Sequence, residues 1–127
     1  MRKAIAAAVA LLALVAGSAL SAEDELDTDL MQSIEDSNKS LASNIAIKDG
    51  KGATTDAKDL AEMFAKVEGF YVKKGDAADA VDLSKKSREL TAQILQQVGA
   101  KNFDAATDSA TTLSRTCKTC HNFYKKS

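Results

Sequence analysis

The chain has 127 residues, a length that suits one compact domain. Its 17 basic and 18 acidic residues nearly balance, so its charge does not point to nucleic acid or to a membrane surface as a partner. The sequence has no proline, few aromatic residues and many helix formers, which predicts a mostly helical protein. Valine and isoleucine do not alternate with polar residues, so no strand pattern appears.

Residues 1–22 have the layout of a secretory signal peptide. A positively charged start precedes an apolar run over 4–14, and small residues follow before Glu23. The run is short for a membrane span, and no later segment qualifies as one. We therefore expect cleavage near Ala22, a periplasmic location and a single domain over 23–127, with an uncleaved anchoring helix as the alternative. An oxidising compartment requires a use for the two cysteines.

Glycines and capping residues divide the remaining chain into four helical segments. The expected ranges are 26–47, 56–74, 76–98 and 103–125. The two later connections are short, and short connections favour antiparallel neighbours. The sequence therefore predicts an all-α fold, an antiparallel up-down four-helix bundle.

The helix boundaries are assigned from left-handed stops and N-cap residues. Two glycines are expected to break the chain after the first helix, Gly50 and Gly52, and the candidate caps of the second are Thr54, Thr55 and Asp56. Left-handed stops are expected at Gly75 and Gly99, with the next helices capped by Asp76 and Asn102. Gly69, inside the second helix, either admits a bulky group to the backbone or is a tolerated surface glycine.

Each segment carries an apolar stripe with a spacing of three and four residues. In the first segment this stripe consists of Met31, Ile34, Leu41 and Ile45, and Asn38 fills the remaining seam position. The stripe of the last segment runs from Phe103 to Tyr124 and includes both cysteines.

The string Cys117-Lys118-Thr119-Cys120-His121 has the spacing of a c-type haem attachment site. Cysteines three positions apart share a helix face and can each form a thioether with a haem vinyl group, while His121 can bind the iron. A disulfide between them would be strained, a thioredoxin-like pair needs an α/β fold, and a zinc site needs four ligands. The sequence thus predicts one covalently bound haem c with its iron.

The sixth position of the iron is open to a methionine, to another side chain or to no ligand at all. His121 is the only histidine, so a second histidine from the same chain is excluded. An antiparallel first helix would place its start, with Met31, near the end of the last helix, whereas Met63 is not near a matching helix end. Met31 is therefore the candidate sixth ligand, and ordinary core packing is its alternative role.

The segment 117–126, C-K-T-C-H-N-F-Y-K-K, resembles the C-terminal signature of the cytochrome c-prime family, the class II c-type cytochromes. The resemblance implies a four-helix bundle with haem in its core, and two branches. In the low-spin branch a methionine binds the iron and the protein carries electrons, and Leu30-Met31-Gln32 looks like that pattern. In the high-spin branch an apolar residue covers a five-coordinate iron that binds small gases, and Ile34 would take this place in a shifted alignment. The family's arginine near the ligand is missing; Asp27 and Asp29 lie there instead.

The function that these observations predict is electron transfer by a periplasmic, mono-haem c-type cytochrome with His121 and Met31 as iron ligands. The alternative is a five-coordinate cytochrome c-prime that binds NO or CO. An enzyme is not expected, because no second histidine is available as a distal base. Redox proteins are the expected partners, with a homodimer left open. A basic cluster, Arg115, Lys118, Lys125 and Lys126, either steers an acidic redox partner or complements the helix dipole.

Overall fold

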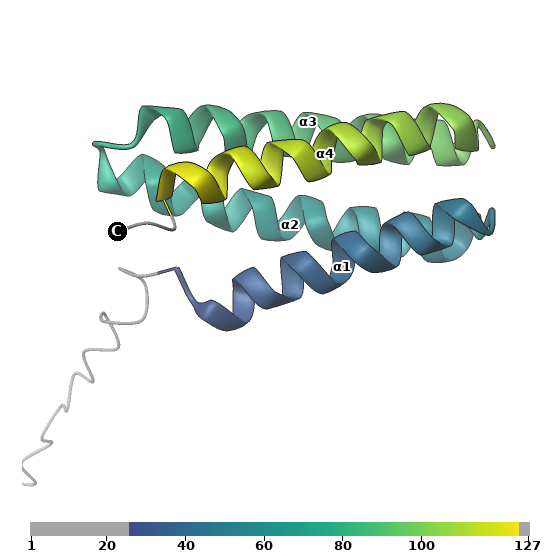
Figure 1. Ribbon diagram of the computed structural model, residues 1–127, viewed down its shortest axis with the longest axis horizontal. Helices are drawn as coiled ribbons and strands as arrows, with labels where there is room; N and C mark the ends of the chain where they lie inside the picture. Colours follow the sequence, from purple (N-terminus) through teal and green to yellow (C-terminus); the bar gives the residue numbers. More distant parts are fainter. Residues whose placement is uncertain (1–25, 125–127) are drawn as a thin grey trace, which may run out of the picture.

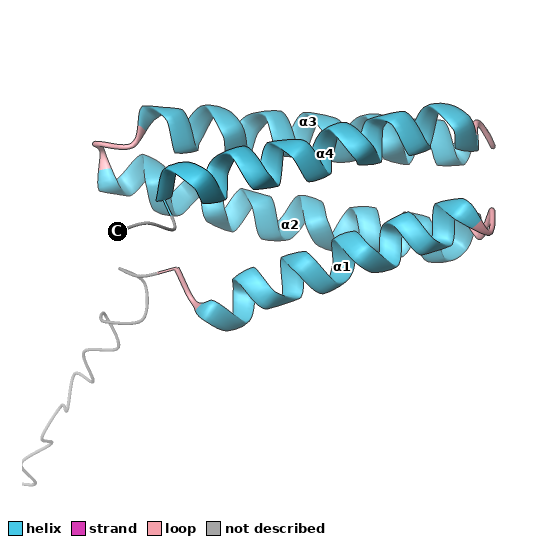
Figure 2. Cartoon of the chain, in the orientation of Figure 1, coloured by secondary structure: helices cyan, strands magenta, loops and turns pink. Residues whose placement is uncertain are grey.

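The structure is a computed structural model that describes residues 26–124. It contains four helices, α1 (Thr28–Ala46), α2 (Gly50–Lys74), α3 (Ala78–Gly99) and α4 (Phe103–Tyr124), and the described residues include no strand. The helices run up and down along a common axis (Figure 1), and loops occur only at its two ends (Figure 2). The predicted all-α four-helix bundle is confirmed. The predicted signal peptide lies outside the described residues.

The core follows the axis of the bundle, and each helix contributes to it. Leu41, Leu60, Ile94 and Leu113, one from each helix, are 0% exposed. Burial of each such side chain contributes about 1.5–3 kcal/mol to folding. No described helix has the length and apolar character needed to cross a membrane.

The four helices contact one another as a ring in the order of the chain. Among neighbouring pairs, α2 and α3 pack most closely, and α1 packs least closely against α4. The seam between α1 and α4 is therefore the least tightly closed side of the bundle.

The helix α2 begins at Gly50, earlier than the predicted residue 56. Its N-cap is Asp49, whose Oδ1 accepts a hydrogen bond from the Gly52 backbone N–H at 3.0 Å. This bond satisfies a free N–H of the first turn and offsets the cost of glycine in a helix, about 1 kcal/mol for each residue. The prediction that Gly50 and Gly52 lie between the helices is therefore wrong.

The predicted caps of α2 have other partners. The hydroxyls of Thr54 and Thr55 donate to carbonyls one turn earlier in α2. Asp56 accepts hydrogen bonds from Ser40 at 2.8 Å and from Asn44 at 2.7 Å. Asp56 thus links α2 to α1 instead of capping α2.

The two later connections confirm some predicted boundary residues and correct others. Gly75 has φ 79° and ends α2 in the left-handed conformation, as predicted. The helix α3 begins after Ala77, so Asp76 is not its N-cap. Gly99 is the last helical residue of α3, and the left-handed residue of that turn is Lys101, with φ 58°. Asn102 accepts a hydrogen bond from the Ala105 backbone N–H at 3.2 Å, which supports its predicted role as the cap of α4.

Candidate functional site

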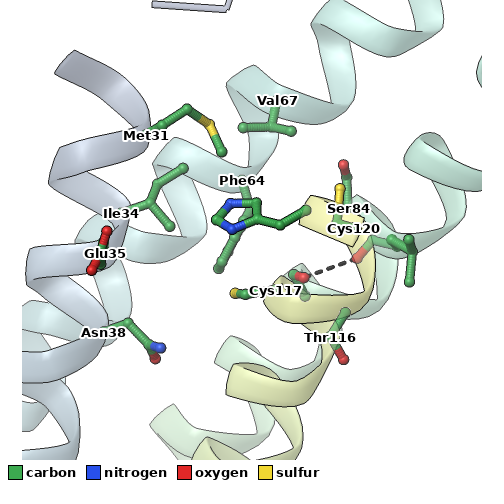
Figure 3. Close-up of a pocket in the computed structure, with 13 residues that line it drawn as sticks. Met31, Ile34, Glu35, Asn38, Phe64, Val67, Ser84, Thr116, Cys117 and Cys120 are labelled. Carbon is green, nitrogen blue, oxygen red and sulfur yellow. Dashed lines mark hydrogen bonds between the residues drawn. The ribbon is translucent and has the colours of Figure 1, made fainter. Parts of the chain in front are cut away.

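A pocket opens between α1 and α4, where α1 begins and α4 ends. Its cavity measures about 90 Å³, and its apolar lining includes Ile34, Phe64, Val67 and Leu83. Met31, Cys117, Cys120 and His121 all line it (Figure 3). The four residues selected from the sequence, which come from opposite ends of the described chain, thus meet in one place.

Cys117 and Cys120 lie in the last two turns of α4, and both are free, half-buried thiols. Burial, together with the nearby Cys120, raises the pKa of the Cys117 thiol to about 11. Burial also raises the pKa of Cys120. Thiols of this kind stay protonated at neutral pH, whereas redox-active cysteine pairs have lowered pKa values. The environment therefore argues against a thioredoxin-like pair.

His121 follows Cys120 directly and lines the same pocket from the end of α4. It is exposed to solvent, so its imidazole is accessible at the mouth of the pocket. Arg115 and Lys118 are exposed on the same helix. The other two members of the predicted basic cluster, Lys125 and Lys126, lie outside the described residues.

Met31 lines the pocket from the opposite helix. It is half-buried, and its thioether side chain extends from α1 toward the space between the helices (Figure 3). Ile34, one turn later, is 5% exposed and lines the same pocket. Met63 packs against the core and is not among the residues that line the pocket. Iron binding by Met31 stays a prediction, but its position on the wall facing α4 is a feature of the fold.

Asn38 is a polar residue in the pocket wall whose role the sequence did not reveal. Its Nδ2 donates a hydrogen bond to the Ser114 Oγ of α4 at 3.1 Å. Its Oδ1 is buried and accepts no hydrogen bond from the part of the chain that the structure describes. The available signal was the interruption of the apolar seam of α1 at Asn38. The partner Ser114 gave no signal, because it lies beside the apolar stripe of α4.

The residues of this pocket fit a covalently bound haem in their chemistry. Two thiols share a helix face, an imidazole follows them, a thioether faces them from α1, and the remaining lining is mainly apolar. The α1 side of the pocket is its less tightly packed wall, because α1 packs least closely against α4. Among residues 26–124, no group of three or more His, Cys, Asp or Glu is placed to hold a metal ion.

Comparison of the chain with protein-family models, curated proteins and solved structures found no match. The features that bear on function are therefore the motif in α4 and the residues that the fold places around it.

Proposed function

We propose that this protein is a c-type cytochrome that carries one haem and transfers single electrons. Cys117 and Cys120 would hold the haem through thioether bonds, and His121 and Met31 would bind its iron from opposite sides. The observation that carries the proposal is the pocket itself, because the C-x-x-C-H residues of α4 and Met31 of α1 line the same cavity. Core packing alone does not explain why a methionine of α1 lines the same pocket as the two thiols and the imidazole of α4.

Each part of the pocket has a role in this function. The two cysteines fix the cofactor covalently to α4, and the imidazole and the thioether sulfur set its orientation. Ile34, Phe64 and Val67 form an apolar wall that excludes water. When bound, the haem supplies one-electron chemistry between ferrous and ferric iron, and a methionine ligand raises the reduction potential.

The proposal includes export to the periplasm and exchange of electrons with other redox proteins. Arg115 and Lys118 are exposed near the attachment motif and supply positive charge beside the pocket. Such charges mainly accelerate the encounter with an acidic partner rather than strengthen the final complex.

Mass spectrometry and optical spectroscopy of the exported protein test this proposal. We expect a mass increase of one haem, and ferric spectra with the charge-transfer band of methionine-ligated iron. Met31→Ala should retain the covalent haem but lose this band and gain carbon monoxide binding in the reduced state. Met63→Ala is the matched control, because Met63 does not line the pocket, and it should keep the band. A purified, exported chain without covalent haem would refute the proposal.

A second candidate function is the binding of NO or CO at five-coordinate iron. It is favoured by Ile34, a buried apolar residue that lines the pocket one turn from Met31. If Ile34 rather than Met31 faces the iron, the wild-type spectrum will be high-spin and reduced protein will bind carbon monoxide readily. Met31→Ala will then leave the spectrum unchanged.

A further inference from the structure

Asn38 interrupts the apolar seam of α1 at a position where an apolar residue would pack. Its seam neighbours Ile34 and Leu41 are 5% and 0% exposed. The amide of Asn38 leaves one buried oxygen without a hydrogen bond from the described residues, which is unfavourable for stability. A single asparagine in an apolar seam is known to fix the register of packed helices at a cost in stability. Asn38 thus has the character of a residue that determines register.

The hydrogen bond between Asn38 and Ser114 joins the two helices that pack least closely against each other. A cavity lies in the α1–α4 seam on each side of this bond. One is the pocket described above, and the other measures about 100 Å³ and is lined by residues that include Ile45 and Ala110. The neighbouring seam is therefore loosely filled, so direct apolar packing between α1 and α4 contributes little to fixing their relative position.

The same bond sets which residue of α1 lies level with His121. Met31 precedes Asn38 by seven residues, and His121 follows Ser114 by seven. Because α1 and α4 are antiparallel, both steps lead in the same direction along the bundle, by two turns or about 10.5 Å. A contact between Asn38 and Ser114 therefore places Met31 opposite His121, and both line the pocket at that level.

A different register would also place apolar residues at these two levels of the α1–α4 seam. If α1 slid by one turn of three residues, Ile34 would lie level with His121, and Leu41 would lie level with Ser114. Ile34 and Leu41 are both apolar, so each suits an inward-facing position in the seam. Asn38, however, would lose its bond to Ser114 and remain a polar group in the seam, so this bond discriminates between the two registers.

We propose that Asn38 and Ser114 are positioning residues that fix the register of α1 against α4 and so select Met31, rather than Ile34, to face His121. The consequence for iron ligation rests on the proposed function, whereas the register itself is a property of the protein with or without an iron ligand on α1.

The test uses Asn38→Leu and Ser114→Ala in the exported, full-length protein. Asn38→Leu fills the seam with an apolar side chain and should fold at least as stably as the wild type. Two measurements follow on each variant, the ferric spectrum and the nuclear Overhauser contacts between the methyl groups of Ile45 and Ala110. Loss of one hydrogen bond should lower the ratio of methionine-ligated to methionine-free iron roughly fivefold to tenfold. In the wild-type register Ile45 lies level with Thr107, and the slide by three residues brings it level with Ala110. The Ile45–Ala110 contacts should therefore strengthen in parallel.

Asn44→Ala is the matched control, because Asn44 is also an asparagine of α1 but donates across the bundle to Asp56 of α2. This variant should lower thermal stability and leave the spectrum and the Ile45–Ala110 contacts unchanged. The proposal is overturned if Asn38→Leu and Ser114→Ala both keep the wild-type contacts. If the wild-type iron has no methionine ligand, the proposed electron carrier is contradicted. The register proposal is still decided in that case, because the Ile45–Ala110 contacts of the variants report on it independently.

Discussion

At the scale of single residues, the environment of Cys117 has a direct chemical consequence. The thiolate is the reactive form of cysteine, and burial together with Cys120 raises the pKa of Cys117 to about 11 from its usual value near 9. In the haem-free chain, we expect Cys117 to react with iodoacetamide at pH 8 about 100-fold more slowly than in the urea-unfolded chain, from ionisation alone. The rate should rise with pH until about pH 11, and mass spectrometry of the alkylated protein measures it.

Cys120 is also a free thiol, so this prediction about Cys117 needs a control. The Cys120→Ser variant isolates Cys117 and removes the charge that adds to the effect of burial. The pKa of Cys117 should then fall toward its usual value but stay above it, because burial is the larger cause. Rapid alkylation at pH 7 in the folded variant would contradict the buried, protonated thiol and revive the redox-active alternative.

At the scale of elements, the start of α2 depends on a single carboxylate. Asp49 caps the helix through Gly52, and loss of an N-cap of this kind costs about 1 kcal/mol. We therefore expect Asp49→Ala to lower the free energy of unfolding by roughly that amount in urea titrations. Thr55→Ala is the control, because the exposed Thr55 side chain bonds only back to the Lys51 carbonyl. If Thr55→Ala proved the more damaging change, the helix would begin at the later position.

Gly69, inside α2, and Gly75, which follows its last residue, should respond in opposite ways to substitution by alanine. Gly75 has φ 79°, a conformation that alanine adopts only with strain, so Gly75→Ala should cost about 1 kcal/mol. Gly69 is helical, and a Cβ built there meets no described atom within 4 Å, so Gly69→Ala should stabilise the protein by about 0.5–1 kcal/mol. Thermal unfolding of the two variants measures both effects. A destabilising Gly69→Ala would instead indicate that a bulky group approaches that backbone.

The four helices show which features of the fold could be predicted from the sequence. Apolar periodicity predicted four helices and the inward face of each, because burial imposes a spacing of three and four residues. It did not predict the start of α2, because Gly50 and Gly52 were interpreted as helix breakers. Their low helix propensity is outweighed locally by the cap at Asp49. The left-handed residue before α4 was likewise assigned to Gly99 from its type, whereas the turn places Lys101 there.

For the whole molecule, the candidate site was predictable as a set of residues but not as an arrangement. The C-x-x-C-H spacing specified Cys117, Cys120 and His121, and antiparallel topology brought Met31 to the same end of the bundle. The remaining wall, which includes Phe64 and residues of α3, depends on how four helices pack in three dimensions. The partner of Asn38 depends on the register between helices far apart in sequence, which periodicity within one helix does not determine.

The looseness of α1 against α4 leads to a prediction about the dynamics of the whole bundle. Regions with few packing contacts open more often and exchange their amide hydrogens faster. In the haem-free chain, residues 31–38 of α1 should therefore exchange faster than the central turns of α2 and α3, which pack most closely. Covalent attachment of haem should slow exchange over 31–38 by at least about tenfold, because new contacts then link this segment to α4.

Hydrogen exchange followed by mass spectrometry, on haem-free and haem-loaded protein at one pH, makes this comparison. The α2–α3 pair is the internal control, since only Phe64 and Val67 of α2 and a few residues of α3 line the pocket. If haem merely added global stability, all four helices would gain protection together. Protection concentrated in 31–38 and the last turns of α4 would instead mean that the cofactor closes the loosely packed seam between α1 and α4. Equal exchange of α1 and α3 in the haem-free chain would contradict the loose seam on which this argument depends.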